Sequence, residues 1–493
     1  MWMAHQERCD KDGQGNAIGT SIDAVRRGGV LAKTGGHTAA SGPTTRRYQN
    51  LPSRVRVAQC KKQKECLASS SCVLCHTWER STSKMGELSP PPWAVSLLLL
   101  LLMVVVLTSP AAAAPQVRQR RFESMFSLGD SYADTGNGPV VFGWHGIANP
   151  VMRPPYGSTF FRRPTGRNCD GRLPIDFLAE SMGLPLVPPF LARNGTAARS
   201  FRRGANFAVG GATALDTTFF HRWDPPGGNV FPLNTSLAVQ MQWFESLKPD
   251  LCATPKECKD LFSRSLFFVG AFGANDYLLS LAANKSIHQV RTYVPDVVRT
   301  ISKAVQRLIQ HGATTVVVPG VIPVGCAPPV LVTFADPDPA AYDARTGCLK
   351  AINDLAAHHN ALLRESLREL QAKQHRRPAE VGGADIVYAD FFTPVIDMVT
   401  SPAKFGFEGD VLTLCCGGSG RFNYNKRFFC GDPGAVRCRD PSARLFWDGV
   451  HLTEAAYRYI AAGWLSSIKS PAASDGSGGT NRTDATPTVE SSC

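Results

Sequence analysis

The sequence predicts an α/β fold, in which a mainly parallel β-sheet is covered by α-helices. Two observations support this class. Short apolar runs recur from about residue 122 onward, in the pattern of strands that are buried on both faces. Longer amphipathic stretches separate these runs, and such alternation implies a parallel sheet packed against helices. No repeat period stands out in the chain.

Four apolar runs are the candidate strands. Each is short and nearly continuous, which indicates burial on both faces. They cover residues 122–128, 265–273, 314–320 and 384–390.

Three stretches predict helices. In residues 294–313, apolar side chains fall three or four positions apart along one face, and Gly312 supplies a stop. Residues 348–370 repeat this design, and a shorter helix is expected after residue 451, with Ala456 and Ile460 on one side. The adjacent histidines His358 and His359 fall within the second helix. We expect them to lie at the edge of a helix face and not to take part in catalysis.

The basic charge of the chain is concentrated near its start. The net charge is +13, of which residues 1–84 carry +8. This head lacks apolar periodicity and is rich in small, polar and basic residues, so we expect it to be disordered or not translated, with Met85 as the real start. Its five cysteines include one C-x-x-C pair, and a zinc site would need a second pair. No aromatic–basic interleaving indicates a nucleic-acid partner.

A hydrophobic segment follows the head. Residues 93–107 are almost entirely apolar, then Pro110 and a run of alanines follow. The segment is shorter than the roughly 20 residues of a membrane span, so we interpret residues 85–114 as a cleaved signal peptide, with the mature chain starting near 112–116. A retained anchor is the alternative, because no positive charge lies between Met85 and the segment, and three arginines follow it.

Two further features are expected of a secreted protein. N-glycosylation acceptor patterns occur at Asn194, Asn234, Asn284 and Asn481. The region after residue 115 also contains ten cysteines, which behind a signal peptide indicate disulfides. The plausible pairings are Cys252 with Cys258, Cys326 with Cys348, and a knot among Cys415, Cys416, Cys430 and Cys438.

Four polar motifs are placed where catalysis is expected in such a fold. Open α/β sheets bind ligands at the carboxyl ends of their strands. Read alone, Ser131 is a turn serine and Asp448 a residue that begins a helix; the four motifs together carry more weight. They are Gly129-Asp130-Ser131, the glycine-rich stretch 204–213, Gly273-Ala274-Asn275-Asp276, and the stretch 446–460, in which Asp448 precedes His451 by three residues.

Together and in this order, the four motifs resemble the plant GDSL esterase/lipases, a branch of the serine hydrolases named for Ser-Gly-Asn-His blocks. The resemblance covers about 122–468, with supporting segments at 155–180, 321–328 and 415–425. It implies a three-layer α/β/α sandwich around a mainly parallel, five-stranded sheet of the flavodoxin-like type. The tail, 469–493, is rich in Ser, Gly, Thr and Asp and is expected to be unfolded.

The resemblance also assigns roles. Ser131 is the nucleophile, His451 the base that takes its proton, and Asp448 the group that orients the imidazole. The oxyanion donors are the Ser131 N–H, a glycine N–H aligned to Gly211 with Gly210 as the competing choice, and the Asn275 side chain. Gly129 is expected to allow a tight exit from the first strand, and Asp130 to brace the loop. No cofactor or metal is implied.

One departure from the family is visible: Tyr132 stands where the naming word of the family has leucine, a position expected to carry no catalytic role.

The implied protein is a secreted or secretory-pathway ester hydrolase without a stable membrane span. An acyltransferase and a catalytically dead, glycan-binding wall protein are the alternatives. Acetylated polysaccharides, choline or phenolic esters and lipids all remain open as substrates. The expected specificity loops are 143–165 and 216–235, with aromatic residues Trp144, Tyr156, Phe219, Phe220 and Trp223.

Overall fold

The computed structural model describes residues 121–191, 198–222, 231–376 and 383–469, together with Pro91 and Trp93. The expected head at 1–84, nearly all of the expected signal peptide, and the tail beyond Lys469 lie outside the described residues. So do Asn194, Trp223, Asn481 and Cys493.

A five-stranded, wholly parallel sheet forms the centre, in the order β2-β1-β3-β4-β5. This is the strand order of flavodoxin-like folds, so the predicted class and architecture are confirmed. The first strand pairs with both neighbours, and Met125 lies opposite Gly204 on one side and Leu266 on the other. The strands are β1 (Ser124–Gly129), β2 (Gly204–Asn206), β3 (Ser265–Gly270), β4 (Thr315–Pro319) and β5 (Asp385–Ala389).

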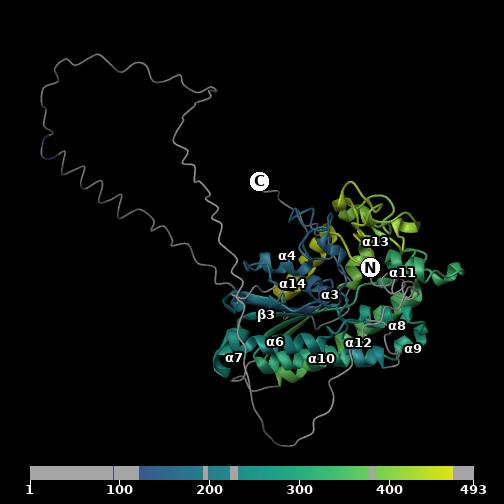
Figure 1. Ribbon diagram of the computed structural model, residues 1–493. Helices are drawn as coiled ribbons and strands as arrows, with labels where there is room; N and C mark the ends of the chain where they lie inside the picture. The colour runs from purple at the N-terminus through teal and green to yellow at the C-terminus, as the bar shows by residue number, and fades with distance from the viewer. Residues whose placement is uncertain are drawn as a thin grey trace, which may run out of the picture. The chain divides into compact units, whose positions relative to one another are not determined.

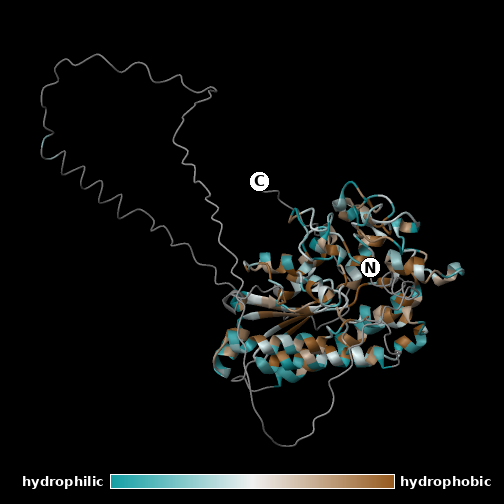
Figure 2. Cartoon of the chain, in the orientation of Figure 1, coloured by the Kyte–Doolittle hydropathy of each residue, from teal (hydrophilic) through white to brown (hydrophobic). Residues whose placement is uncertain are grey.

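Helices cover both faces of this sheet, and Figure 1 shows them as two layers. One layer contains α6 (Leu237–Leu251), α7 (Pro255–Ser263), α10 (Val294–His311) and α12 (Lys350–His375). On the opposite face lie α3 (Gly138–Trp144), α4 (Pro174–Ser181), α13 (Phe392–Thr400) and α14 (Glu454–Lys469). Figure 2 shows apolar strands between helices whose outward faces are hydrophilic, which is the pattern of a sandwich core.

Shorter helices complete the connections. The α-helices are α5 (Thr217–His221), α8 (Ala274–Ala282), α9 (Ile287–Arg291) and α11 (Pro328–Thr333). The 3₁₀ helices are η1 (Pro150–Met152), η2 (Ala198–Arg203), η3 (Val324–Cys326), η4 (Pro339–Ala341), η6 (Pro402–Phe405), η7 (Arg421–Asn423) and η8 (Pro441–Ala443).

The predicted helices follow the spacing of apolar residues. The apolar face of α10 is buried from Val294 to Ile309, and the helix ends at Gly312, whose φ of 113° favours glycine. Each such side chain stabilises the fold by about 1.5–3 kcal/mol on burial. The face of α12 is buried in the same way, including Leu355 and Leu363, and Ala456 and Ile460 of α14 are buried as expected.

The strand predictions differ from the structure at two points. The run at 265–273 predicted a longer strand, but β3 ends at Gly270 because the backbone of Ala271 turns to a φ of 55°. The sequence did not predict β2, because this strand is only three residues long, begins with a glycine and contains no apolar run. A strand this short takes its conformation from its pairing with β1 and has too few side chains to show a pattern.

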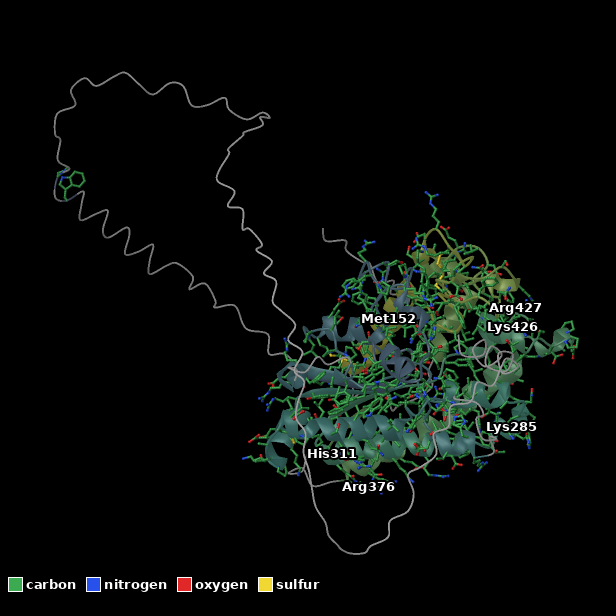
Figure 3. The ribbon with its side chains drawn as sticks, viewed as in Figure 1. Met152, Lys285, His311, Arg376, Lys426 and Arg427 are labelled. Atoms are coloured by element: carbon green, nitrogen blue, oxygen red, sulfur yellow. A yellow bond between two sulfur atoms is a disulfide. The ribbon has the colours of Figure 1, made fainter. Side chains whose placement is uncertain are left out.

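A second, smaller core lies beside the sandwich. It is made of Val151, Tyr156, Trp447 and cysteines of two disulfides, next to the two-stranded ladder of β6 (Cys416–Gly417) and β7 (Val436–Arg437). Figure 3 places Met152 on the same side of the molecule as Lys426 and Arg427, opposite His311 and Arg376 of the helical layer.

Candidate active site

The carboxyl ends of β2, β1 and β3 bring the first three polar motifs together. Because these strands are adjacent and parallel, their following loops share one edge of the sheet. Ser131 follows β1, Gly210 and Gly211 follow β2, and Asn275 follows β3. All four residues line one pocket, which His451 also lines. The order of strands in the sheet, rather than proximity in sequence, therefore assembles the site.

A tight turn presents Ser131. The backbone N–H groups of Ala133 and Asp134 donate to the carbonyl of Asp130 at 3.1 and 3.0 Å. The carboxylate of Asp130 accepts the N–H of Tyr132 at 3.0 Å, so it braces the loop as expected. Burial is the main cause that raises the pKa of Asp130 well above its usual range. Ser131 itself is 7% exposed, and that exposure faces the pocket.

The requirement for glycine at position 129 differs from the prediction. Its φ is not positive, so no tight exit from the strand demands glycine. A Cβ at this position would lie 2.5 Å from the carbonyl oxygen of Gly270 on β3. The constraint is thus the close approach of the two strand ends. The side chain of Gln240 also holds the end of β1, because it bonds both the N–H and the carbonyl of Gly129.

The fourth motif supplies a histidine–carboxylate pair. His451 Nδ1 lies 2.5 Å from Asp448 Oδ1. A carboxylate oxygen accepts, so this contact assigns Nδ1 as the donor to Asp448 and leaves Nε2 as the ring nitrogen not used by the pair. A backbone bond from Trp447 N–H to the His451 carbonyl, at 2.8 Å, closes the loop that carries both residues.

The backbone distinguishes Gly211 from Gly210. The N–H of Gly210 donates to Asp134 Oδ2 at 2.8 Å, so it is occupied. In the described part of the chain, no acceptor pairs with the N–H of Gly211 or that of Ser131. Asn275 donates from Nδ2 to the carbonyl of Ala212 at 2.9 Å, which fixes its amide beside these two groups. Of the two candidate glycines, only Gly211 therefore has a backbone N–H without an acceptor among the described residues.

Asp134 joins the loops after β1 and β2. Its carboxylate accepts backbone N–H groups from Gly136, Asn137, Gly138 and Gly210, at 2.7–2.8 Å. Burial raises its pKa to about 6, opposed by these four donors. Sequence reasoning did not select Asp134; its place three residues after the serine, before a glycine-containing turn, was the available signal.

Asp276 has the corresponding role between the loop after β2 and α8. Its two carboxylate oxygens accept the N–H groups of Ala214 and Leu215, at 2.9 and 3.0 Å. Burial raises the pKa of Asp276 to about 7, although these two hydrogen bonds act in the opposite direction. Because Asp276 adjoins Asn275 in α8, the bonds hold the helix that carries the candidate donor against the glycine loop.

The pocket also contains a residue that sequence reasoning missed. Asn168 is 3% exposed, lines the pocket, and has no hydrogen-bond partner among the described residues. It lies in the 155–180 segment, whose resemblance to the family was the only signal. The remaining lining is apolar apart from Tyr424: Phe142, Phe231, Leu278, Leu279, Pro329, Val330 and Val450.

Two tyrosines contact the loop of the histidine. The hydroxyl of Tyr156 donates to Asp448 Oδ2, and that of Tyr132 donates to the carbonyl of Val450 at 2.9 Å. The sequence predicts Tyr156 only as an aromatic residue of a specificity loop. Of the other aromatics noted there, Trp144 is 62% exposed, and Phe219 packs edge-on against Phe220 and Tyr293.

His359 is not at the edge of its helix. It is fully buried, and its Nδ1 lies 2.7 Å from the hydroxyl of Tyr277. Burial lowers its pKa to about 3, so it is neutral. The pair joins α12 to α8, and His359 is no member of the pocket lining.

The cysteine pairings match the expectation. Four disulfides join Cys252 to Cys258, Cys326 to Cys348, Cys415 to Cys438 and Cys416 to Cys430. Among the described cysteines only Cys169 is unpaired, and it is buried. Asn234 and Asn284 are exposed, as glycan acceptors must be.

The described residues contain neither a candidate membrane span nor a candidate metal site. None of the helices there combines the length and apolar character needed to cross a bilayer. No cluster of three or more histidine, cysteine or acidic side chains there is suited to a metal ion.

A flavodoxin-like sheet with a pocket serine and a histidine–carboxylate pair at its strand ends defines a class: α/β hydrolytic enzymes of the serine type. The family model described as GDSL-like lipase/acylhydrolase matches residues 125–464. A GDSL esterase/lipase of Arabidopsis thaliana is 44% identical over 349 residues, which cover 70% of this chain and 91% of the relative. A second is 40% identical over 71% of this chain and 86% of its own length. The chain belongs to the GDSL-like lipase/acylhydrolase family and is a carboxylic ester hydrolase.

Proposed function

We propose that this protein is a secreted, glycosylated serine esterase that cleaves acyl or acetyl esters through an acyl-enzyme on Ser131. The observation that supports this most strongly is the shared pocket. It contains a serine, the histidine of a histidine–aspartate pair, and two backbone N–H groups without acceptors among the described residues. Four disulfides support secretion, because disulfides persist in oxidising compartments.

The proposed reaction has two halves. Ser131 Oγ attacks the ester carbonyl while His451 Nε2 takes its proton, and the oxyanion is stabilised by the N–H groups of Ser131 and Gly211 and by the Asn275 amide. The carbon–oxygen bond to the alcohol then breaks, and the alcohol leaves with the proton from His451. Water, deprotonated by His451, attacks the acyl-enzyme and releases the acid, and the proton returns to Ser131. Asp448 stabilises the imidazolium in both halves.

The lining of the pocket indicates what it accepts. Apolar side chains from α8, α11 and the loop before α6 make up most of its wall, including Leu278, Val330 and Phe231. Such a wall favours an acyl group without charge, since burying an unpaired charge is costly. Asn168 offers the same wall one further hydrogen-bonding group.

Nitrophenyl esters with acetyl, octanoyl and palmitoyl groups test the proposal. The purified, deglycosylated protein is expected to release nitrophenol from at least one ester, and the ranking of kcat/KM reports the length of acyl group that the wall accepts. Ser131→Ala is expected to release none. No turnover with any ester, or equal turnover by Ser131→Ala, would contradict the proposal. An added acceptor alcohol that captures the acyl group faster than water would instead identify an acyltransferase.

A further inference from the structure

We infer that two buried tyrosine hydroxyls, those of Tyr156 and Tyr132, position the loop 448–451 for proton transfer. Tyr156 acts on the carboxylate of Asp448, and Tyr132 acts on the backbone next to His451. The inference rests on the proposed function, because it concerns the base of that reaction. Both are positioning residues, since neither needs to touch the ester.

Tyr156 completes the hydrogen bonding of the Asp448 carboxylate. Oδ1 faces His451 Nδ1 at 2.5 Å, and Oδ2 accepts the Tyr156 hydroxyl, so the carboxylate is held on both sides. Tyr156 is 2% exposed and meets Trp447 edge-on, with ring centroids 5.9 Å apart. Burial first, and then the charge of Asp448, raise the pKa of Tyr156 well above its usual value. The hydroxyl therefore keeps its proton and remains a donor.

The cluster around Tyr156 is cross-linked. The N–H groups of Cys415 and Cys416 donate to the carbonyls of Phe446 and Trp447, at 2.9 and 2.8 Å. Both cysteines are in disulfides, so the segment that leads into Asp448 is bonded to a cross-linked part of the chain. A donor that holds a catalytic pair in one geometry must itself be held rigidly, and this cluster holds Tyr156.

Tyr132 joins the two halves of the site directly. It follows Ser131 in the chain, and its hydroxyl donates to the carbonyl of Val450, the residue before His451, at 2.9 Å. Its ring also meets His451 edge-on, with centroids 5.8 Å apart. A leucine, as in the naming word of the family, could not make this bond. The departure at position 132 therefore adds a link between the nucleophile's turn and the base's loop.

The two hydroxyls are expected to act differently on His451. Donation to Asp448 withdraws negative charge from the carboxylate that faces the imidazole, so losing it makes His451 more basic. Donation to a neutral carbonyl fixes position without a comparable charge effect. The other ionisable groups that face the pair or these tyrosines are Tyr457, Asp130, Asp432 and Cys169.

Phenylalanine variants separate the two effects, with Tyr388→Phe as the matched control. The hydroxyl of Tyr388 is buried on β5 and has no hydrogen-bond partner among the described residues, so its removal should leave activity unchanged. Tyr156→Phe is expected to lower kcat roughly tenfold or more, with KM nearly constant. It should also move the acidic limb of the kcat/KM profile to higher pH. Tyr132→Phe is expected to lower kcat without moving that limb.

A second substitution covers the possibility that Tyr156→Phe folds poorly. Site-specific 3-fluorotyrosine at position 156 retains the hydroxyl and makes it a stronger donor, so the acidic limb should move to lower pH. If both phenylalanine variants match Tyr388→Phe in kcat and pH profile, or the fluorotyrosine leaves the limb unmoved, the inference is overturned. Labelling of Ser131 by a fluorophosphonate in the wild-type protein keeps this outcome distinct from failure of the proposed function.

Discussion

The side-chain amide of Asn275 is held in the pocket by two hydrogen bonds of unequal strength. One amide N–H is held by the Ala212 carbonyl at 2.9 Å. The nearest partner for the other is Asp130 Oδ2 at 3.4 Å, which is a long and weak contact. The amide is thus oriented by its first bond, and in the proposed reaction it loses little when the second N–H donates to the developing oxyanion in place of this weak contact. In the proposed reaction, Ser131 and Gly211 contribute backbone N–H donors, whose positions are set by the main chain.

Replacing Asn275 by alanine is expected to lower kcat by ~10²–10³, because one of several oxyanion donors is lost. Steady-state kinetics on the best nitrophenyl ester measures this effect, with Ser131→Ala and His451→Ala setting the background. An Asn275→Ala protein with unchanged kcat would remove Asn275 from the site. All three variants should have the circular dichroism spectrum of the wild type, since none of these side chains fills the core.

Single residues were predictable where a motif specifies them. Ser131, Asn275, Asp448 and His451 were all predicted from the sequence, and the structure brings the three pocket-lining members of this set together with Asp448 behind His451. Tyr156 is 292 residues from Asp448 in sequence. A contact of that range has no local pattern, so sequence reasoning could place Tyr156 only as a loop aromatic.

At the scale of elements, carboxylates hold the loops to one another. Asp276 binds the loop after β2 to α8, and Asp134 binds it to the loop after β1. These buried acids have raised pKa values, chiefly through burial. A carboxyl with a higher pKa in the folded state takes up a proton on folding. Its stabilising contribution is therefore present at low pH and is lost as the pH rises through the folded pKa.

Asp276 is expected to show this dependence, with a window from its ordinary value of 3.8 to about 7. The unfolding free energy of the wild type, relative to Asp276→Asn, should fall by on the order of 1 kcal/mol per pH unit across that window and level off above it. Urea unfolding of both proteins at pH 5, 6, 7 and 8 measures the difference. The asparagine loses one acceptor at every pH, so only the slope is diagnostic. A difference that does not vary with pH would contradict the assignment.

Elements with a sufficient pattern were predictable, and short ones were not. The face of α10 has a regular apolar spacing, and it folds as that spacing predicts. The three residues of β2 have no such spacing, yet the loop that follows β2 places Gly211 in the pocket. Its position depends on pairing with β1, which lies about 80 residues earlier and is visible only in three dimensions. The glycine-rich stretch 204–213 predicted the loop, whereas the strand formed by its first three residues required the structure.

At the scale of the whole molecule, disulfides support the catalytic edge unequally. Cys416–Cys430 joins residues 14 apart in sequence beside Trp447 and Tyr156, whereas Cys252–Cys258 joins the end of α6 to α7 across a separation of 6. The first pair packs in the same cluster as Tyr156, whose hydroxyl bonds Asp448, although no cysteine of either pair lines the pocket. The contribution of each to stability and to activity should therefore differ.

Serine replacement of Cys416 and Cys430 together is expected to lower the unfolding free energy by about 3 kcal/mol and also to lower kcat, because the support of Tyr156 is loosened. The matched change at Cys252 and Cys258 should cost less stability, since the loop is shorter, and should spare kcat. Thermal unfolding and ester kinetics on both double variants measure the two effects. Equal loss of kcat in both would contradict a local role for the first pair.

The amino terminus of the mature protein tests whether the chain is secreted. If residues 85–114 are a cleaved signal peptide, amino-terminal sequencing of the secreted protein should begin near residues 112–116. Thiol titration of the same denatured, unreduced material should find at most one or two free thiols. Peptides from residues 1–84 on the mature chain would contradict both the cleavage and our interpretation of the head.

The central claim is that Ser131 is a nucleophile activated by His451, and a fluorophosphonate probe tests it most directly. The folded wild-type protein is expected to bind one equivalent, on a peptide that contains Ser131. His451→Ala should react far more slowly, and Ser131→Ala should not react. Labelling that persists in Ser131→Ala, or a folded wild-type protein that hydrolyses esters without reacting with the probe, would contradict the account.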